Sequence, residues 1–474
     1  MLPKRLCALA LAAALALAAA SAARAQPYDF SQADSLLTNE LPELHGHVAV
    51  IVRQGGVEIY RFQTGDIGYD TRIGLASVTK TISAGVVLAL VDEGLLATGE
   101  RLGDALPLFE HDGLGDPTVR DAWGMRAGIS SAVPYERDPR FTLAESVERI
   151  GLTGFLVFSP PGSQLGYDGA GMQAVGRIAE LRTGQAWEAI ARSRIFDPCG
   201  MPVSDYGQFA PNPSVPGGLR SSAEELIDYA QMILDGGGCA GQRVLSDAAI
   251  EQLFENATRG LPVHHSPFPP AHPLYPYGAD PDYAFGAWVL AEDPATQHVE
   301  ELVGAGAWGS FVWIDRRRGL SAVLVTHIVP GSQTSMDAAL GLFDVARRQV
   351  EGAQARALTP APAGAEARLT WQPAPGSIAT RVYGAATPIR DVYGLRGAEL
   401  LAEVASDTVV VPRFPYYAAT AVFAGLDDTA LVPGVNSVTG FVPEAPQATL
   451  GTLALLTLAL LARRAVPRPA VGGF

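Results

Sequence analysis

The chain has 474 residues, of which 48% are hydrophobic and 18% charged, which is the composition of a globular protein with more than one domain. Its formal net charge is −15. That charge argues against nucleic acid or an anionic membrane surface as the main partner, because both require clustered cations.

The first 25 residues (1–25) are typical of a secretory signal peptide. A basic start at Lys4 and Arg5 is followed by an apolar run and by a small-x-small cleavage site at 23–25. We therefore expect an exported protein whose mature chain begins near Gln26.

Export permits a disulfide, and two cysteines remain once the signal peptide is removed. Cys7 lies within the signal peptide, which leaves Cys199 and Cys239 in the mature chain. The sequence leaves two alternatives open, a disulfide or two small buried thiols. Spacing along the chain does not show whether their Cα atoms come within bonding range.

The first strands and the first long helix follow the signal peptide. Residues 47–63 predict a β-hairpin, in which two apolar runs are joined by a turn at 54–56. A helix is predicted from about Ser77 to Gly94, with apolar residues at four-residue intervals. It is apolar nearly all round, so we expect it to lie buried in the core.

Helices and then strands complete the first domain, 26–352. From about 97 to 250 the pattern predicts helices and loops. The later strand-like runs and the closing helix cover 283–290, 309–315, 319–326 and 335–350. This order predicts an α/β (α+β) fold. It has an antiparallel sheet built from both ends of the domain, flanked by N- and C-terminal helices, and an inserted all-helical subdomain.

A second, smaller domain follows an Ala- and Pro-rich stretch at 353–365, which is predicted to be a linker. Residues 366–441 contain short strands between turns, which is typical of a small β-sandwich. The runs 369–371, 381–383 and 417–422 resemble those of a fibronectin type III module. That resemblance implies a spacer or an adhesion module without chemistry of its own.

The last segment, 442–474, is predicted to be a sorting signal or a membrane anchor. It resembles the PEP-CTERM class of bacterial sorting signals, since it has a Pro-Glu motif within 442–446, an apolar stretch at 448–462 and a basic pair at 463–464. As a helix rising ~1.5 Å per residue, the apolar run would be shorter than the ~30 Å thickness of the hydrocarbon core of a bilayer. An ordinary C-terminal membrane anchor stays open as the alternative, and both imply membrane association through this segment.

The most informative feature of the composition is the scarcity of lysine. The chain contains only Lys4 and Lys80, so the mature protein would keep a single lysine among many arginines. An ammonium group can lose its proton when it is desolvated, whereas a guanidinium effectively cannot. Lys80 therefore marks a position where arginine would not serve.

Ser77 precedes this lysine by three residues, one helical turn away on the same face. A serine hydroxyl beside a general base is the minimum for nucleophilic catalysis. The N-terminus of the helix adds N–H groups that favour a developing negative charge. The alternative is a solvated lysine on an amphipathic helix, and the apolar residues around Lys80 argue against it.

Residues 76–81 resemble the Ser-x-x-Lys motif of the serine β-lactamase and penicillin-binding superfamily. Three further segments match the family in order: 161–163 with Tyr167 as the second motif, 217–222 as a turn into a helix, and 304–310 with 313–315 as the third motif and its strand. The resemblance spans about 30–350. It implies a serine hydrolase related to class C β-lactamases that needs no cofactor and no metal.

The same resemblance implies the roles of the site residues. Ser77 would be the nucleophile, and Lys80 together with Tyr167 would act as its base. The backbone N–H groups of Ser77 and Ala307 would form the oxyanion hole. The third motif itself would be Gly304, Ala305 and Gly306.

Two departures from the family pattern bear on the substrate. The second motif usually reads Tyr-x-Asn, and Gly169 stands where the asparagine amide would bind a substrate amide carbonyl. The third motif usually opens with Lys or His, and Gly304 stands there instead. That cation helps to hold a substrate carboxylate. Its loss favours the esterase-like branch of the superfamily.

Aromatic and histidine side chains are expected around the cleft. The residues predicted to line it are Gly169, Trp308 and Tyr277, together with His264, His265 and His272 of a Pro-rich loop at 255–282. No cysteine or carboxylate stands at ligand spacing from these histidines, so we expect no metal.

The sequence thus predicts an exported hydrolase of a small ester, amide or peptide, with no nucleic-acid partner. An esterase or amidase leads, followed by a D-Ala-D-Ala-type peptidase or a β-lactamase. The alternative of another class is a catalytically silent surface protein that kept the fold and binds a partner. The location would be the periplasm, the outer surface or the membrane of the cell envelope.

Overall fold

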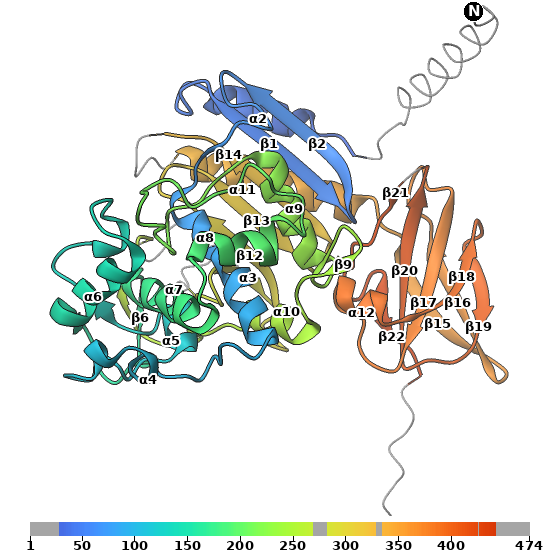
Figure 1. Cartoon of the computed structure of the whole chain (residues 1–474). Helices are drawn as coiled ribbons and strands as arrows, with labels where there is room; N and C mark the ends of the chain where they lie inside the picture. The colour runs from blue at the N-terminus through green and yellow to red at the C-terminus, as the bar shows by residue number, and fades with distance from the viewer. Residues whose placement is uncertain (1–27, 269–281, 329–333, 425, 442–474) are drawn as a thin grey trace, which may run out of the picture.

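The computed structural model describes residues 28–268, 282–328, 334–424 and 426–441 (Figure 1). The predicted signal peptide and C-terminal tail lie outside the described residues, as do Tyr277 and His272. None of the helices in the described part of the chain is long and apolar enough to cross a lipid bilayer.

A six-stranded antiparallel sheet forms the centre of the first domain, in the order β11-β12-β13-β14-β1-β2. Its strands are β1 (Val48–Gln54), β2 (Val57–Thr64), β11 (Trp288–Glu292), β12 (Val299–Ala305), β13 (Phe311–Asp315) and β14 (Leu320–Val325). The N-terminal hairpin joins the later strands through β1 and β14, where Val50 lies opposite Leu324. The prediction of an antiparallel sheet assembled from both ends of the domain is confirmed.

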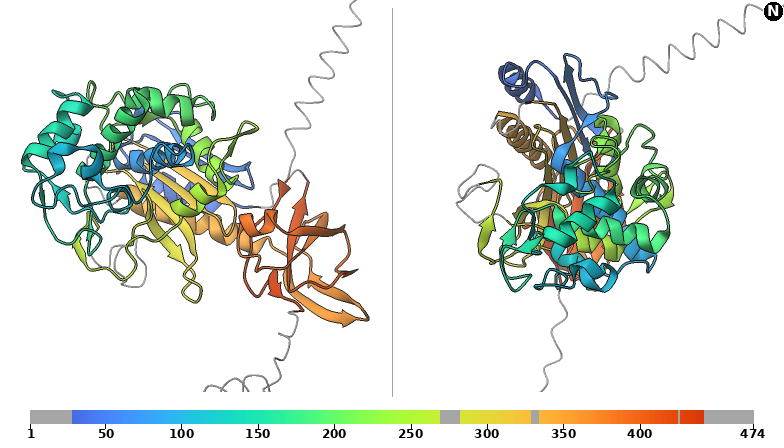
Figure 2. Two further views of the ribbon diagram at one scale, coloured as in Figure 1. Left: turned by 60° about the horizontal axis from the view of Figure 1, so that its bottom comes forward. Right: turned by 60° about the vertical axis from the view of Figure 1, so that its left-hand side comes forward.

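Helices cover both faces of this sheet (Figure 2). On one face α2 (Ser31–Glu40) packs against α11 (Thr334–Gly352), which are the predicted flanking helices. On the other face α9 (Ala223–Leu234) packs against β1, β13 and β14. Beside it runs α3 (Thr79–Asp92), which is buried along nearly its whole length, as its uniformly apolar sequence predicts.

Between α3 and α9 the chain forms the predicted helical subdomain. Its helices are α4 (Leu102–Ala105), α5 (Val119–Trp123), α6 (Leu143–Thr153), α7 (Ala170–Thr183) and α8 (Trp187–Ala191), and α10 (Asp247–Leu253) follows α9. Capping boxes begin two of them, with Thr118 before α5 and Thr142 before α6. Each threonine satisfies a backbone N–H that would otherwise lack a partner in the first turn.

Sequence patterning missed β12, the strand that leads into the third motif. Glu300 and Glu301 lie in that segment, and two adjacent charges do not predict a buried strand. Glu301 is nevertheless only 2% exposed, because Arg318 donates to it at 2.9 Å and Arg347 at 3.0 Å. Ion pairing across elements therefore overrides the local polarity.

The C-terminal domain consists of two antiparallel sheets that share a core. One sheet has the order β15-β16-β19, and the other has the order β18-β17-β20-β21 with β22 also paired to β20. The strands are β15 (Arg356–Ala363), β16 (Glu366–Gln372), β17 (Ala379–Ala385), β18 (Glu399–Val404), β19 (Thr408–Val411), β20 (Tyr416–Phe423), β21 (Leu426–Asp427) and β22 (Ser437–Thr439). Leu369 and Trp371 of the first sheet are buried with Val382, Tyr417 and Ala419 of the second.

The prediction of a linker at 353–365 was wrong for most of its length. Residues 356–363 form β15, which pairs with β16 and begins the sandwich earlier than expected. Pro360 and Pro362 made the segment look irregular. They are tolerated because β15 is an edge strand, which need not donate every N–H to a neighbour.

The sandwich packs directly against the first domain. Asp391, at the start of α12 (Val392–Arg396), lies 2.8 Å from His298 Nε2 and 3.5 Å from Arg316 Nε. Both Asp391 and Arg316 are nearly inaccessible to solvent. The hydrogen bond from Val392 N to Arg316 O fixes the same contact through the backbone.

A second buried carboxyl lies where the sandwich meets the N-terminal end of the domain. Asp428 accepts hydrogen bonds from Tyr28 Oη at 2.5 Å and from Gln54 Nε2 at 2.9 Å. Its side chain is fully buried, and this burial raises the pKa of Asp428 to about 7. Buried polar pairs of this kind hold the two domains in one relative position.

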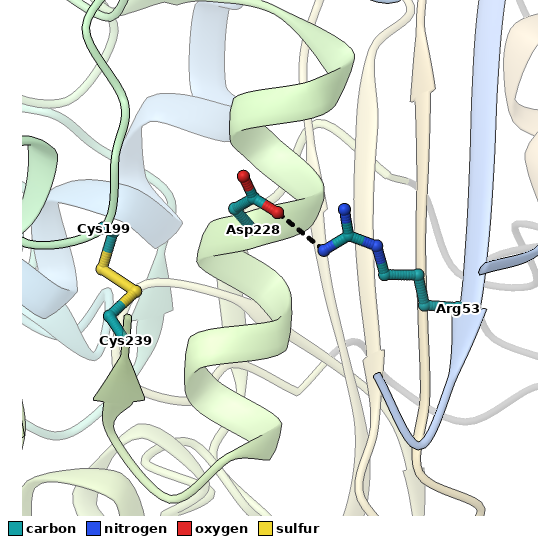
Figure 3. Close-up of a disulfide and its surroundings, with 4 residues drawn as sticks. All are labelled: Arg53, Cys199, Asp228 and Cys239. Carbon is teal, nitrogen blue, oxygen red and sulfur yellow. Dashed lines mark hydrogen bonds and ion pairs between the residues drawn. A yellow bond between two sulfur atoms is a disulfide. The ribbon is translucent and has the colours of Figure 1, made fainter. Parts of the chain in front are cut away.

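A disulfide joins Cys199 to Cys239, with Cα atoms 5.0 Å apart, which decides between the two alternatives left open by the sequence (Figure 3). The bridge lies beside α9, which on its other side is tied to β1 by the ion pair between Asp228 and Arg53 at 2.6 Å. It therefore links the end of the helical subdomain to the segment after α9.

Replacing both Cys199 and Cys239 by serine should lower the free energy of unfolding by about 2–4 kcal/mol, because the bridge closes a loop across a sequence separation of 40. The check is a denaturant titration of the mature protein with and without reductant. Reductant should shift the midpoint of the wild type and leave that of the double variant unchanged. An equal response of both proteins would contradict this prediction.

Candidate active site

A cavity of about 530 Å³ lies where the start of α3, the end of β12 and the helical subdomain meet. Residues predicted for the site that line it are Ser77, Lys80, Tyr167, Gly169, Ala307 and Trp308. Residues that line it without having been predicted include Ser130, Ser131, Glu136 and Phe209. The structure therefore brings together three separate sequence motifs around one opening.

Ser77 and Lys80 lie in one turn at the start of α3. Ser77 belongs to a short 3₁₀ turn, Ala76–Val78, that leads directly into the helix. Lys80 Nζ is 2.9 Å from Ser77 Oγ and 3.0 Å from the carbonyl oxygen of Pro216. Ala76 has φ 47°, so the residue before the serine is held in the left-handed region that L-residues seldom occupy.

The amine of Lys80 is almost removed from water, with only 5% of the residue exposed. Desolvation penalises a charged amine unless hydrogen-bond acceptors surround it. Ser77 Oγ and Pro216 O are two such acceptors, and the ring of Tyr167 lies 4.9 Å from Nζ. The amine is thus fixed in direction towards the serine hydroxyl.

Tyr167 is held by its ring and by its backbone. Its ring stacks on Trp288 with centroids 5.1 Å apart and meets Tyr283 edge-on at 6.0 Å. Its amide donates to His265 O at 3.0 Å, next to the pairing of β6 (Leu165–Gly166) with β10 (Val263–His265). The phenol therefore stands on a rigid aromatic base at the cavity wall.

Gly306 allows the end of β12 to approach the serine turn. A Cβ at this position would lie 2.4 Å from the carbonyl oxygen of Leu75, closer than any side chain could fit. Ala307 follows and lines the cavity, and within the described residues its amide donates to no protein group. This position suits an N–H donor to a substrate oxygen.

Gly169 leaves space that another residue fills. A Cβ at 169 would lie 2.9 Å from Pro216 Cγ and 3.2 Å from Glu136 Cγ. The Glu136 side chain thus occupies the region where the side chain of an asparagine at 169 would have to go. Burial raises the pKa of the Glu136 carboxyl, and Arg137 and Lys80 partly oppose this effect.

Asp168, between Tyr167 and Gly169, adds a second carboxyl to the cavity wall. Its Oδ1 accepts a hydrogen bond from the amide of Ala170 at the start of α7. Burial raises the pKa of Asp168 to about 7, and the charge of Glu136 raises it further, while the hydrogen bonds from Ala170 and Gly169 and the charge of Lys80 oppose the shift. The cavity therefore holds two titratable acids beside one amine.

Gly304 is closed off in the same way. A Cβ at this position would lie 2.4 Å from Thr81 Oγ1, which donates to Gly286 O at 3.1 Å. Thr81, on α3, thus fills the space that a lysine or histidine of the third motif would need. Ala305 completes β12, so of the third motif only the segment from Ala307 reaches the cavity wall.

The predicted histidines separate in the structure. His265 lines the cavity, whereas the ring of His264 packs at 5.6 Å from the ring of Phe158. Over the ranges that the structure describes, no group of histidine, cysteine or carboxylate side chains is arranged to hold a metal ion.

Glu136 could not be found by sequence reasoning, because it lies in a short 3₁₀ turn, Tyr135–Arg137, and belongs to no motif. Only the missing asparagine at position 169 hints that another side chain supplies polarity there. Phe209 gives no signal either, as a single aromatic residue in a loop.

Comparison with known proteins identifies the class. The family model described as Beta-lactamase matches residues 38–346, which is well over half of the chain. The chain belongs to this family, whose members are serine hydrolases with a mixed α/β fold, and related esterases and penicillin-binding proteins are among its relatives.

Two curated relatives are each 27% identical to this chain. Esterase EstB of Burkholderia gladioli aligns over 63% of this chain and 90% of its own length. Penicillin-binding protein 4 of Amycolatopsis lactamdurans aligns over 36% of this chain, and the match spans only about half (54%) of that protein.

Solved structures share the fold. A putative β-lactamase from Bacteroides dorei superimposes with a TM-score of 0.60 at 23% identity, covering 68% of this chain and 99% of its own. A family VIII carboxylesterase gives a TM-score of 0.52 at 16% identity, covering 68% and 97%.

Gly304→Ala should destabilise the protein by about 1–3 kcal/mol, because the new methyl group would overlap Thr81 Oγ1. In a Thr81→Ala background the same change should cost at least ~1 kcal/mol less, since the overlapping oxygen is gone. Denaturant midpoints of the four proteins measure the coupling. Additive effects would show that Thr81 does not exclude a side chain from position 304.

Proposed function

We propose that this chain is an exported serine hydrolase that works through an acyl-enzyme, most simply an esterase or amidase of a small acyl substrate. The observation that carries the proposal is the 2.9 Å contact between Ser77 Oγ and Lys80 Nζ at the wall of an open cavity. Lys80 is also the only lysine outside the predicted signal peptide. This supports a function at position 80 that an amine can perform and a guanidinium cannot.

In the proposed reaction Lys80, as a neutral amine, takes the proton of Ser77 while Oγ attacks the substrate carbonyl carbon. The negative charge that develops on the carbonyl oxygen is met by the amides of Ser77 and Ala307. The bond to the leaving group then breaks, and the leaving group receives a proton through Tyr167. Water, activated near Tyr167, releases the acid and restores the serine hydroxyl.

An ester or amide without a carboxylate fits the two glycines better than a β-lactam or a D-Ala-D-Ala end. Neither the cation at position 304 nor the amide at position 169 is present to hold the polar groups of those substrates. Relatives named Esterase EstB and a family VIII carboxylesterase support this preference. The alternative is a D-Ala-D-Ala-type peptidase, and the relative named Penicillin-binding protein 4 supports that alternative.

For the second domain we propose a fibronectin type III-like module. The sheet order β15-β16-β19 against β18-β17-β20-β22 supports it, as does Tyr417. The Tyr417 hydroxyl donates to Pro412 O at 3.0 Å and accepts from Phe414 N at 2.7 Å, in the manner of a tyrosine corner. We further propose export by residues 1–25 and sorting to the cell envelope by a PEP-CTERM-like tail at 442–474.

The first test is labelling of the mature protein with a fluorophosphonate probe, read by intact mass. The wild type should gain a single adduct, and Ser77→Ala should gain none. Lys80→Arg should label at least 100-fold more slowly, because arginine cannot serve as the base. Matching thermal melting curves would show that the variants are folded.

Ser193→Ala is the matched control, because Ser193 is an exposed serine away from the cavity. Among the described residues its hydroxyl bonds to the backbone oxygens of Ala189 and Ile190 and to the side chain of Arg194. It should label like the wild type. Absence of an adduct on the wild type would instead favour a silent surface-binding protein that kept the Ser77–Lys80 pair as a relic.

The proposed preference for neutral substrates predicts that kcat/KM for a simple phenyl ester exceeds that for a cephalosporin by at least tenfold. The reason is the missing cation, since a hydrogen bond to a charged group contributes about 1.5–3 kcal/mol. Parallel absorbance assays on the same preparation measure both. Cephalosporin hydrolysis at a rate rivalling the ester would overturn the esterase assignment and favour a β-lactamase.

A further inference from the structure

We infer that Glu136 makes this cavity select substrates that carry an ammonium group on the acyl part, next to the bond that is cleaved. The inference rests on the proposed function and deepens it by naming the substrate class. Neither the sequence motifs nor the proposed catalytic residues include Glu136.

Glu136 places a carboxyl group beside the glycine at position 169. Its Cγ lies 3.2 Å from where a Cβ at position 169 would be, and its side chain lines the same cavity as Ser77 and Lys80. An asparagine at 169 would have presented an amide to a carbonyl group of the substrate. A carboxylate presents only acceptors, so in the same region it reverses the polarity of recognition.

The Glu136 carboxyl also has unused acceptor capacity. Within the described residues its hydrogen bonding is limited to its own backbone amide, and its nearest cationic partner is Arg137 Nε at 4.0 Å. The Arg137 side chain is 64% exposed and the Glu136 side chain 18%, so the arginine stays largely solvated at the rim. A charged acceptor that is mostly buried gains from a donor that enters the cavity.

The other charged groups around the cavity do not replace such a donor. Lys80 Nζ is occupied by Ser77 Oγ and Pro216 O, and in the proposed reaction it must be neutral. Asp168 adds a second acid to the same wall. His265 also lines the cavity, and its backbone oxygen accepts a hydrogen bond from the amide of Tyr167. An ammonium group would find two carboxyls there, whereas a carboxylate would meet like charge.

The aromatic side of the cavity suits an aryl group. The rings of Phe209 and Trp308 lie 6.4 Å apart and both line the opening. A compact acyl group at the carboxyl wall and a phenyl ring at the aromatic wall can therefore be combined in one probe. Anilides meet this requirement and can be made with a cationic, a neutral or an anionic acyl end of nearly equal size.

The experiment measures binding to the full mature chain carrying Ser77→Ala, which cannot turn the probes over. Dissociation constants are determined by calorimetry at pH 8 for 3-aminopropananilide, butyranilide and succinanilic acid. The aminopropananilide should bind at least about tenfold more tightly than butyranilide, since it can form a charge-assisted hydrogen bond with Glu136. Succinanilic acid should bind most weakly.

Glu136→Gln in the same background should reduce the preference for the cationic anilide to about twofold or less. Glu148→Gln, which makes the same change at an exposed position on α6, should leave the preference intact. Equal affinities for the three probes, a preference for succinanilic acid, or no binding at millimolar concentration would overturn the inference. So would a preference that survives Glu136→Gln in a protein with an unchanged melting curve.

The two proposals fail separately. If the wild type takes no fluorophosphonate adduct while the cationic preference and its loss in Glu136→Gln are observed, the hydrolase function is overturned and the binding selectivity stands. If the adduct forms and the preference is absent, the hydrolase function stands and the role of Glu136 is overturned.

Discussion

The burial of a single amine is the constraint on which the rest of the site depends. Lys80 is 5% exposed, and an ammonium so far from water is unstable unless acceptors are fixed around it. Pro216 O is one of them, and it reaches the amine because the segment after it is tied to the start of α3. Leu75 N donates to Leu219 O at 3.0 Å, and Leu219 N donates to Thr79 Oγ1 at 3.1 Å. Distant parts of the chain must therefore fold together before the buried amine has its second acceptor.

A second buried charge stabilises the sheet that leads into Ala307. Glu301 on β12 is surrounded by Arg318, Arg347 and the indole N–H of Trp313. Although burial favours the neutral acid, these arginines hold the pKa of Glu301 below its usual value. Losing one partner would leave an uncompensated charge in the core, a defect worth about 3–5 kcal/mol. The network fixes β12 in register, and with it the position of Ala307.

What the sequence could predict depended on whether the signal was local. Ser77 and Lys80 are three residues apart, and the apolar helix that carries Lys80 starts directly after Ser77. Neighbouring residues alone therefore predicted the helix and the contact between the two side chains. β12 was missed because the arginines that neutralise its buried Glu301 lie in later parts of the chain. β15 was missed because its prolines are tolerated only in an edge strand, and the sequence did not show that this strand lies at an edge. Glu136 itself gave no signal, since its place at the cavity depends on the absence of a side chain at Gly169, which lies in another segment.

The two glycines that depart from the family pattern are therefore not simple losses. At each of them a side chain from another element occupies the vacant space, Glu136 with Pro216 at position 169 and Thr81 at position 304. Restoring the usual residue alone would produce overlap in a close-packed wall, not a restored binding group. Each of these glycines is thus matched to a side chain on another element. A change of substrate would require both members of a pair to change together.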